Sequence, residues 1–227
     1  MSQHASNHDP YVSQRNEMVQ TQLLSRGVLD TLVLKAMRHV PRHAFLPKNL
    51  WKYAYEDGPL PIGFEQTISQ PYMVAYMTEK LVLHPNDRVL EIGSGSGYQA
   101  AVLAEIVDSV FTMEIVPELG MRAQEILSQL NVQNIQVRIG DGYSGWPEKA
   151  PFDAMIITAA PPSIPGPLIE QLKPGGRMIL PVGVTSQQLI LITKNKQGGI
   201  EKKTLLPVRF VPMTGEINKL KPPVDTK

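Results

Sequence analysis

A run of glycines directly after a short apolar segment constrains this chain more than any other feature. Arg88 to Ile92 is a largely apolar run with β-branched members, which is typical of a strand buried on both faces. Gly93, Gly95 and Gly97 then alternate with serines, and a helix-compatible pattern resumes over 99–107. Glycines tolerate positive φ and close ligand approach, and a helix start offers unpaired N–H groups. The segment therefore predicts a strand, turn and helix that bind a phosphate or a nucleotide.

Two kinds of nucleotide-binding fold share this pattern. Residues 95–100 fit the dinucleotide fingerprint G-x-G-x-x-A. Glu91 lies inside the strand, two residues before the first glycine, and gives the form E-x-G-x-G-x-G. That form resembles motif I of S-adenosylmethionine-dependent methyltransferases, in which the loop meets the methionine end of the cofactor. A turn that serves only close packing is the structural alternative.

Composition narrows the class of protein. The 227 residues suit one domain with an appendage, and the formal net charge of +1 gives no field that favours nucleic acid or a membrane surface. The absence of cysteine excludes disulfides and zinc–thiolate sites. No apolar stretch approaches the roughly 18 residues of a membrane span, and the N-terminus lacks the apolar core of a signal peptide. We expect a cytoplasmic enzyme without a metal site, and we interpret His4 and His8 as part of a frayed tail.

The first third of the chain predicts helices and a loop-rich segment. Ser13 is the expected N-cap of a helix that ends near Gly27, and Asp30 that of a helix stopped by Pro41. Residues 45–63 are rich in aromatic residues, proline and glycine, which indicates either a cap over the site or an ordinary packed connection. We expect flexible tails at 1–12 and 218–227, a cap at 13–83 that contributes to the substrate site, and a Rossmann-like core at 84–217.

Ser69 stands just before a predicted helix that begins near Pro71 and runs to about Leu83. Proline is favourable at a helix start because an N–H there needs no partner. The Ser69 hydroxyl is therefore a candidate N-cap that accepts from the N–H of Tyr72. On local grounds alone, capping is the favoured role for this serine.

Two acidic residues follow predicted strands on the carboxyl side of the glycines. Glu114 ends the strand 109–114, at the point where an acid binds ribose hydroxyls in such folds. Asp141 follows the strand 135–139 and is a candidate acceptor for an adenine amino group. The alternatives are a surface charge for Glu114 and an Asp-Gly turn residue for Asp141.

The remaining pattern completes an α/β fold. An almost wholly apolar strand is predicted at 152–158 and a short helix at 164–172, after which Lys173-Pro174-Gly175-Gly176 turns into a strand at 178–182. Two last strands at 189–193 and 203–210 flank Gln197-Gly198-Gly199, as expected of an antiparallel pair at the sheet edge. The fold class is a doubly wound, mostly parallel sheet with an N-terminal helical cap.

From about Asn16 to Glu216 the chain resembles the protein-L-isoaspartate(D-aspartate) O-methyltransferase family. The Thr-Ile-Ser segment is the specific match, and it favours a functional Ser69 over a purely capping one. The matching segments are Pro59 to Gly63, Gln66 to Ser69, Glu91 to Gly97, Gly140 to Gly142, Leu172 to Arg177 and Val211 to Thr214.

The resemblance implies a seven-stranded sheet, S-adenosylmethionine as cofactor and no metal. It also implies methylation of the free carboxylate of L-isoaspartyl, and of D-aspartyl, residues in damaged proteins and peptides, which starts repair through a succinimide. Ser69 would orient that carboxylate, in a monomeric enzyme without nucleic-acid or membrane partners. The implied cofactor contacts are Gln66, Thr67, Ile68, Ser69, Glu91, Gly93, Ser94, Gly95, Gly97, Glu114, Ile115, Asp141, Gly142 and Thr214. The implied substrate contacts are Ile62, Ser69, Phe210 and Val211.

The chain departs from the family pattern in two segments, and these departures bear on which other functions the sequence permits. Gly63-Phe64-Glu65 and Gln70-Pro71-Tyr72-Met73 stand where members usually have Gly-His-Gly or Gly-Phe-Gln and Ala-Pro-His-Met. A methyltransferase for another carboxylate, or a cofactor-binding module without turnover, is compatible with those changes. A nicotinamide dehydrogenase leaves the Thr-Ile-Ser segment without a role. A nucleic-acid or amine methyltransferase needs a polar residue where Ala160 opens the segment Ala160 to Ser163.

Overall fold

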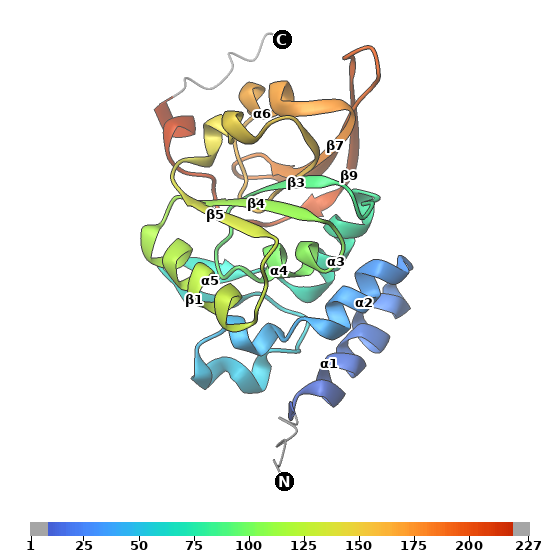
Figure 1. The fold of residues 1–227 in the computed structure, drawn as a ribbon, viewed down its shortest axis with the longest axis vertical. Coiled ribbons are helices and arrows are strands. Elements are labelled where there is room, and N and C mark those ends of the chain that lie inside the picture. The colour runs from blue at the N-terminus through green and yellow to red at the C-terminus, as the bar shows by residue number, and fades with distance from the viewer. Residues whose placement is uncertain (1–8, 220–227) are drawn as a thin grey trace.

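A seven-stranded sheet forms the centre of the computed structural model, which describes residues 9–219 (Figure 1). The spatial order is β5-β4-β3-β6-β7-β8-β9. The strands are β3 (Arg88–Ile92), β4 (Ser109–Glu114), β5 (Ile135–Ile139), β6 (Phe152–Ile157), β7 (Leu172–Val182), β8 (Gln187–Lys194) and β9 (Ile200–Val208). The frayed tail with His4 and His8, and most of the two predicted flexible tails, lie outside the described residues.

Strand direction confirms the predicted doubly wound sheet. β3 pairs in parallel with β4 and β6, β4 with β5, and β6 with β7. β8 is antiparallel to both β7 and β9, so the last two strands extend the sheet as a meander. The chain moves outward from β3 to β5 and then returns to place β6 on the other side of β3. This reversal opens a crevice at the carboxyl ends of β3 and β6, where ligands bind in such sheets.

Helices cover both faces of the sheet. Figure 1 shows α3, α4 and α5 on one face, with α1 and α2 packed outside them, and α6 on the opposite face. The helices are α1 (Val12–Met18), α2 (Thr31–His39), α3 (Pro71–Lys80), α4 (Tyr98–Ala104), α5 (Pro117–Gln129) and α6 (Gly166–Gln171). A two-stranded antiparallel hairpin of β1 (Leu60–Gly63) and β2 (Gln66–Ile68) precedes α3. Within residues 9–219 no helix is long and apolar enough to span a membrane.

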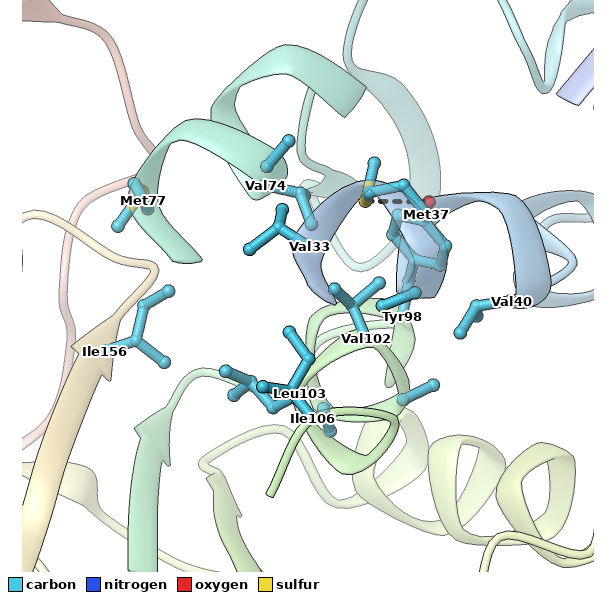
Figure 2. Packing of buried hydrophobic residues seen from close by; sticks show 14 of the residues in the cluster. Val33, Met37, Val40, Val74, Met77, Tyr98, Val102, Leu103, Ile106 and Ile156 are labelled. Atoms are coloured by element: carbon cyan, nitrogen blue, oxygen red, sulfur yellow. Dashed lines mark hydrogen bonds between the residues drawn. The ribbon is translucent and has the colours of Figure 1, made fainter. Parts of the chain in front are cut away.

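The N-terminal helices share one apolar core with the sheet. Figure 2 shows Met37 of α2 between α3 and α4, close to Val74 and Tyr98. The Tyr98 hydroxyl meets the Met37 sulfur at 3.6 Å, and both side chains are almost fully buried. Because this core continues to Ile156 of β6, the N-terminal helices are fixed to the strands that carry the glycine loop. The domain division at 83/84 stays a prediction.

Local signals account for much of this architecture. The Asp30 carboxylate accepts from the N–H groups of Leu32 and Val33, which confirms it as the cap of α2. Gly27 ends the first helical segment with φ of 86°, a conformation that glycine adopts without a side-chain clash. The strand pattern from β3 to β6 agrees with the predicted runs to within a residue.

Two predicted caps are wrong. α1 begins at Val12, before Ser13, and Tyr11 at its cap position makes no side-chain capping bond. α3 begins at Pro71 as expected, but the N–H of Tyr72 donates to Asp57 Oδ1 at 3.1 Å rather than to Ser69. Asp57 approaches from the preceding loop and supplies the acceptor that local sequence assigned to Ser69.

Several element boundaries also differ from expectation, including those of α6, β8 and β9. The Lys173–Gly176 segment is part of β7, because an irregular register lets β7 pair with β6 from Leu172 onward. α3 ends at Lys80, short of the predicted Leu83. The β1–β2 hairpin lies within segments expected to be loop, since three- and four-residue strands are too short to show a periodic pattern.

Candidate active site

A narrow cavity lies at the carboxyl edge of the sheet, between the glycine loop and the hairpin. It receives residues from β2, from the loops after β3, β4 and β6, and from the segment that follows β9. Its lining comprises Gln66, Thr67, Ile68, Ser69, Val74, Ile92, Gly93, Ser94, Gly95, Ser96, Tyr98, Gln99, Met113, Glu114, Ile115, Val116, Gly142, Thr158, Ala159, Val211, Pro212, Met213 and Thr214. We call it the inner cavity.

The glycine loop forms one wall of the inner cavity and needs glycine at its first position. Gly93 has φ of 93°, and a Cβ there would lie 2.5 Å from Thr158 Oγ1. The same threonine hydroxyl donates to the Gly93 carbonyl at 2.6 Å. The N–H groups of Gly93 and Ser94 both donate to the Met113 carbonyl, at 2.8 and 3.1 Å. These bonds hold the loop across β3, β4 and β6 at the switch point of the sheet.

Glu114 lies at the end of β4 with its carboxylate in the inner cavity. Its side chain accepts from the N–H of Gly95 at 2.7 Å and from the N–H of Val116 at 3.0 Å, one bond to each oxygen. An ionised carboxylate has about four lone-pair sites, so acceptor capacity remains for two ligand hydroxyls. The residue is only 5% exposed, which strengthens any such bond. These free acceptor sites fit the ribose hydroxyls of an adenosyl cofactor.

Glu91 does not reach the inner cavity. It is fully buried in β3, where Oε2 accepts from the Thr112 hydroxyl at 2.5 Å and Oε1 has no partner among the described residues. The pKa of Glu91 is raised to about 8, mainly by burial; the Thr112 bond opposes the rise, and the nearby Glu114 carboxylate adds to it. At neutral pH this carboxyl group is therefore largely protonated inside the sheet.

The hairpin covers the opposite side of the inner cavity. Ile62 of β1 is buried and would contact a Cβ at Gly95 at 3.5 Å. Its carbonyl accepts from Arg122 of α5 at 2.6 Å, which attaches the hairpin to the helical layer. The turn between the strands places Phe64 and Glu65 at φ of 54° and 57°, a left-handed region that is costly for side chains of this size.

A second, larger cavity opens on the other side of Ser69. Its volume is about 850 Å³, within the range of small-ligand sites. We call it the outer cavity. It is lined by Arg26, Pro59, Thr67, Ser69, Gln70, Tyr72, Met73, Thr158, Leu206, Pro207, Val208, Arg209, Phe210, Val211 and Pro212. The two cavities share Thr67, Ser69, Thr158, Val211 and Pro212, so a ligand in one can meet a ligand in the other at this junction.

A buried arginine holds the backbone at Ser69. Arg42 is 0% exposed, and its guanidinium donates to three carbonyl oxygens: Ala54 at 2.8 Å, Ser69 at 2.9 Å and Gly58 at 3.2 Å. Burial lowers the pKa of Arg42 to about 10, so the group keeps its charge at neutral pH. The planar fork joins two loops to the residue at the cavity junction.

Asp57 organises the rim of the outer cavity. Besides capping Tyr72, it accepts from the Gln70 side-chain amide at 2.7 Å and pairs with Arg26 through Oδ2. The Arg26 guanidinium also lies 3.5 Å from the ring centroid of Tyr72, a cation–π contact. The two departures from the family pattern, Gln70 and Tyr72, are thus held by one carboxylate.

A family model described as protein-L-isoaspartate(D-aspartate) O-methyltransferase matches residues 13–218. The chain belongs to this family. The match spans the N-terminal helices, the hairpin and the whole sheet.

Relatives of the protein-L-isoaspartate O-methyltransferase family resemble the chain along most of its length. The protein-L-isoaspartate O-methyltransferase of Gloeobacter violaceus is 55% identical over 201 residues, which cover 88% of this chain and 98% of that protein. That of Synechococcus sp. (strain JA-2-3B'a(2-13)) is 52% identical over 213 residues, covering 90% and 87%. A solved protein-L-isoaspartate O-methyltransferase superposes with a TM-score of 0.81 at 31% identity, covering 89% of this chain and 67% of that one. A structure from Plasmodium falciparum, in complex with S-adenosyl-L-homocysteine, has a TM-score of 0.77 at 27% identity, covering 88% and 98%.

The structure brings most of the family-implied residues together. Those lining the inner cavity are Gln66, Thr67, Ile68, Ser69, Gly93, Ser94, Gly95, Glu114, Ile115, Gly142, Val211 and Thr214. The outer cavity is lined by Phe210 and by Thr67, Ser69 and Val211, which line both. Four others lie outside both linings: Ile62, Glu91, Gly97 and Asp141. Asp141 accepts from the N–H groups of Tyr143 and Glu216, which fits the turn alternative. Direct ligand contacts at these four positions stay predictions.

The sequence analysis did not identify several residues that line the inner cavity. Thr158 and Ala159 follow β6, and they line the inner cavity because β6 is the neighbour of β3. The end of the apolar run 152–158 was a usable signal, since carboxyl ends of parallel strands meet at one edge. Three further lining residues have no comparable signal in the sequence: Tyr98 and Gln99 of α4, and Met213.

Proposed function

We propose that this chain transfers a methyl group from S-adenosyl-L-methionine to the free carboxylate of L-isoaspartyl residues in damaged proteins and peptides. D-aspartyl residues present a similar carboxylate and belong to the same proposal. The observation that carries it is the junction at Ser69, where a nucleotide-type cavity meets a larger cavity that can hold a peptide. Membership of the family supports the assignment. The methyl ester formed would close to a succinimide, which begins repair.

The inner cavity is the proposed cofactor site. Glu114 would accept from the ribose hydroxyls, and the segment 66–69 with the Gly93–Gly95 loop would enclose the methionine end. The Ser94 hydroxyl supports this assignment, because it is buried and has no partner among the described residues. Ile115, Gly142 and Thr214 complete the proposed lining. When bound there, the cofactor supplies an electrophilic methyl group on a positively charged sulfur.

The proposed nucleophile needs no catalytic base. A free side-chain carboxyl has a pKa near ~4 and is already ionised at neutral pH. The lining of the outer cavity accordingly includes no aspartate, glutamate or histidine among the described residues. The transfer forms an oxygen–carbon bond and breaks a carbon–sulfur bond, whose electron pair stays on sulfur. No proton has to move for the atoms to balance.

The chain's contribution is alignment in a site with little water. Ser69 lies at the junction, and its hydroxyl can donate to one carboxylate oxygen and leave the other free to attack. Arg42 fixes the Ser69 backbone, and the hairpin covers the inner cavity. Holding two reactants in a productive orientation is worth on the order of 7–11 kcal/mol in favourable cases. Ile62, Phe210 and Val211 are the proposed apolar contacts of the substrate.

The remaining parts of the proposal concern partners and location. A nearly neutral chain without cysteine suits a cytoplasmic monomer that acts on proteins and peptides rather than on nucleic acid. Size-exclusion chromatography with light scattering tests the monomer directly.

Methyl transfer to matched peptides tests the proposed reaction. One peptide contains isoaspartate, and its control contains ordinary aspartate at the same position. We expect formation of S-adenosylhomocysteine and a base-labile methyl ester only with the isoaspartyl peptide. Thermal unfolding with S-adenosylhomocysteine and with NAD provides the cofactor control, and we expect stabilisation only by the former. A chain that is stabilised by S-adenosylhomocysteine yet methylates neither peptide would contradict the proposed substrate.

A further inference from the structure

The charged groups of the outer cavity have a one-sided distribution. Arg26 and Arg209 are the cationic side chains in its lining, and no carboxylate lines it among residues 9–219. The other polar lining groups are hydroxyls and one amide. A peptide lying in this cavity therefore meets positive charge on the wall, while the carboxylate at the rim, Asp57, is paired with Arg26.

The two arginines differ in what they already bind. Arg26 pairs with Asp57 and lies over the Tyr72 ring, so both its charge and its flat face are engaged. The Arg209 side chain is exposed and has no hydrogen bond, ion pair or aromatic contact with any residue from 9 to 219. Arg209 is thus the guanidinium in this wall that remains available to a ligand.

The backbone directly after Arg209 is held by hydrogen bonds. Gln187 of β8 accepts from the Phe210 N–H at 2.6 Å and donates to the Phe210 carbonyl at 3.0 Å. The Val211 carbonyl accepts from the Ala160 N–H at 2.8 Å. The start of the Arg209 side chain is therefore fixed, which lowers the entropy lost when its guanidinium binds a partner.

Arg209 lines only the outer cavity, whereas Ser69 lines both cavities. The carboxylate that receives the methyl group must reach the junction at Ser69. A guanidinium bound to that carboxylate would also reduce its nucleophilicity. The anion that suits Arg209 is consequently a second one, carried by a neighbouring part of the same substrate.

We infer that Arg209 is a specificity-determining residue that selects isoaspartyl substrates with a second carboxylate near the isoaspartyl residue. Guanidinium and carboxylate match in charge and in bidentate geometry. The second carboxylate is supplied either by an acidic side chain within two residues or by a nearby chain terminus. This inference rests on the proposed isoaspartyl methylation and adds the class of peptide that the site prefers.

Peptides of one sequence test the inference. Each contains a central isoaspartate, blocked termini, and Glu, Gln or Lys at one of the flanking positions; a further Gln peptide has a free C-terminal carboxylate. For at least one position we expect kcat/KM to be about three- to tenfold higher with Glu than with Lys, mainly through KM. In about 1 M salt, where the Debye length is about 3 Å, the ratio should approach one. A gain with the free terminus instead of Glu supports the same carboxylate chemistry and identifies the terminus as its source.

Charge variants distinguish the effect of Arg209 on substrate preference from the effect of the protein's net charge. In Arg209→Gln the Glu-to-Lys ratio should fall to about one, and in Arg209→Glu it should invert. Lys203→Glu is the matched control, because it makes the same charge change at an exposed position of β9 outside both linings, and it should keep the wild-type ratio. A ratio near one in the wild type, or a preference that survives Arg209→Gln, overturns the inference. Methylation of the neutral Gln peptide tests the proposed function independently, so the two failures are distinguishable.

Discussion

The guanidinium of Arg42 donates through Nη1 to the carbonyl oxygen of Ser69 at 2.9 Å, across 27 positions of sequence. The same group donates to two further carbonyls, so one fully buried side chain defines where the Ser69 backbone lies. A buried charge is costly unless its hydrogen bonds are satisfied, and here three carbonyls satisfy it. Alignment at the cavity junction thus depends on a residue that lines neither cavity.

Replacing this arginine should cost stability. Arg42→Lys keeps a positive charge but cannot span three carbonyls with a compact ammonium group, so at least one buried carbonyl loses its partner. We expect the free energy of unfolding to fall by about 2–3 kcal/mol, measured by urea denaturation. Arg38→Lys is the control, because within residues 9–219 the Arg38 side chain donates only to the Leu34 carbonyl of its own helix, at 3.4 Å. Equal losses in the two variants would contradict the role assigned to Arg42.

Ser69→Ala should affect the reaction much more than the fold. The Ser69 hydroxyl does not cap α3, so we expect the free energy of unfolding to change by less than about 0.5 kcal/mol. We expect kcat/KM for an isoaspartyl peptide to fall by about tenfold or more, while the affinity for S-adenosylhomocysteine falls less. Ser69→Asp should be folded and nearly inactive, because its carboxylate repels that of the substrate. Normal turnover by a folded Ser69→Asp protein would remove Ser69 from the reaction.

Asp57→Ala should lower stability by removing the cap of α3, a role that local sequence assigned to Ser69. The variant leaves the Tyr72 N–H without its acceptor and releases Arg26 and Gln70. Loss of an N-cap typically costs about 1 kcal/mol, which denaturant unfolding can resolve. Asp57→Asn retains an oxygen at this position and should lose less. If both variants unfold like the wild type, Asp57 does not act as the cap in solution.

Glu114→Gln should weaken cofactor binding. The amide has one acceptor oxygen for two backbone N–H groups and lacks the charge that strengthens bonds to ribose hydroxyls. Each charge-assisted bond is worth roughly 1.5–3 kcal/mol, so calorimetry should show a rise of about tenfold or more in the Kd for S-adenosylhomocysteine. Asp108→Asn is the control, because Asp108 is exposed and lies directly before the same strand. Unchanged affinity in folded Glu114→Gln would remove Glu114 from the cofactor site.

The buried Glu91 predicts a dependence of stability on pH. Its folded-state pKa of about 8 lies above its ordinary value of 4.5, so between these pH values the folded chain holds a proton that the unfolded chain releases. Raising the pH through this window therefore destabilises the fold, by at most about 1.4 kcal/mol per pH unit. Glu91→Gln should remove this contribution. Urea unfolding of both proteins between about pH 5 and 8 measures the difference, and parallel pH profiles would contradict it.

Local sequence was sufficient to predict the elements whose stabilising contacts are local. The apolar runs of β3, β4 and β6 predict central strands because their residues are buried on both faces, whatever their neighbours are. Asp30 caps α2 through the N–H groups of the next residues, within reach of its own side chain. The glycine alternation indicated the site because positive φ and close approach restrict residue choice at each position.

The packing of the whole chain sets the partners of groups that are distant in sequence. Asp57 displaced Ser69 as the cap of α3 because the loop before β1 brings its carboxylate to Tyr72 from 15 positions away. The side chain of Glu91, an implied cofactor contact that stays a prediction, accepts from the Thr112 hydroxyl of the neighbouring strand, 21 positions away. Thr158 lines both cavities because β6 returns to the side of β3, and nothing in its own neighbourhood specifies that return. Hydrogen bonds and cavity walls depend on distance in space, which only the packing of the whole chain sets.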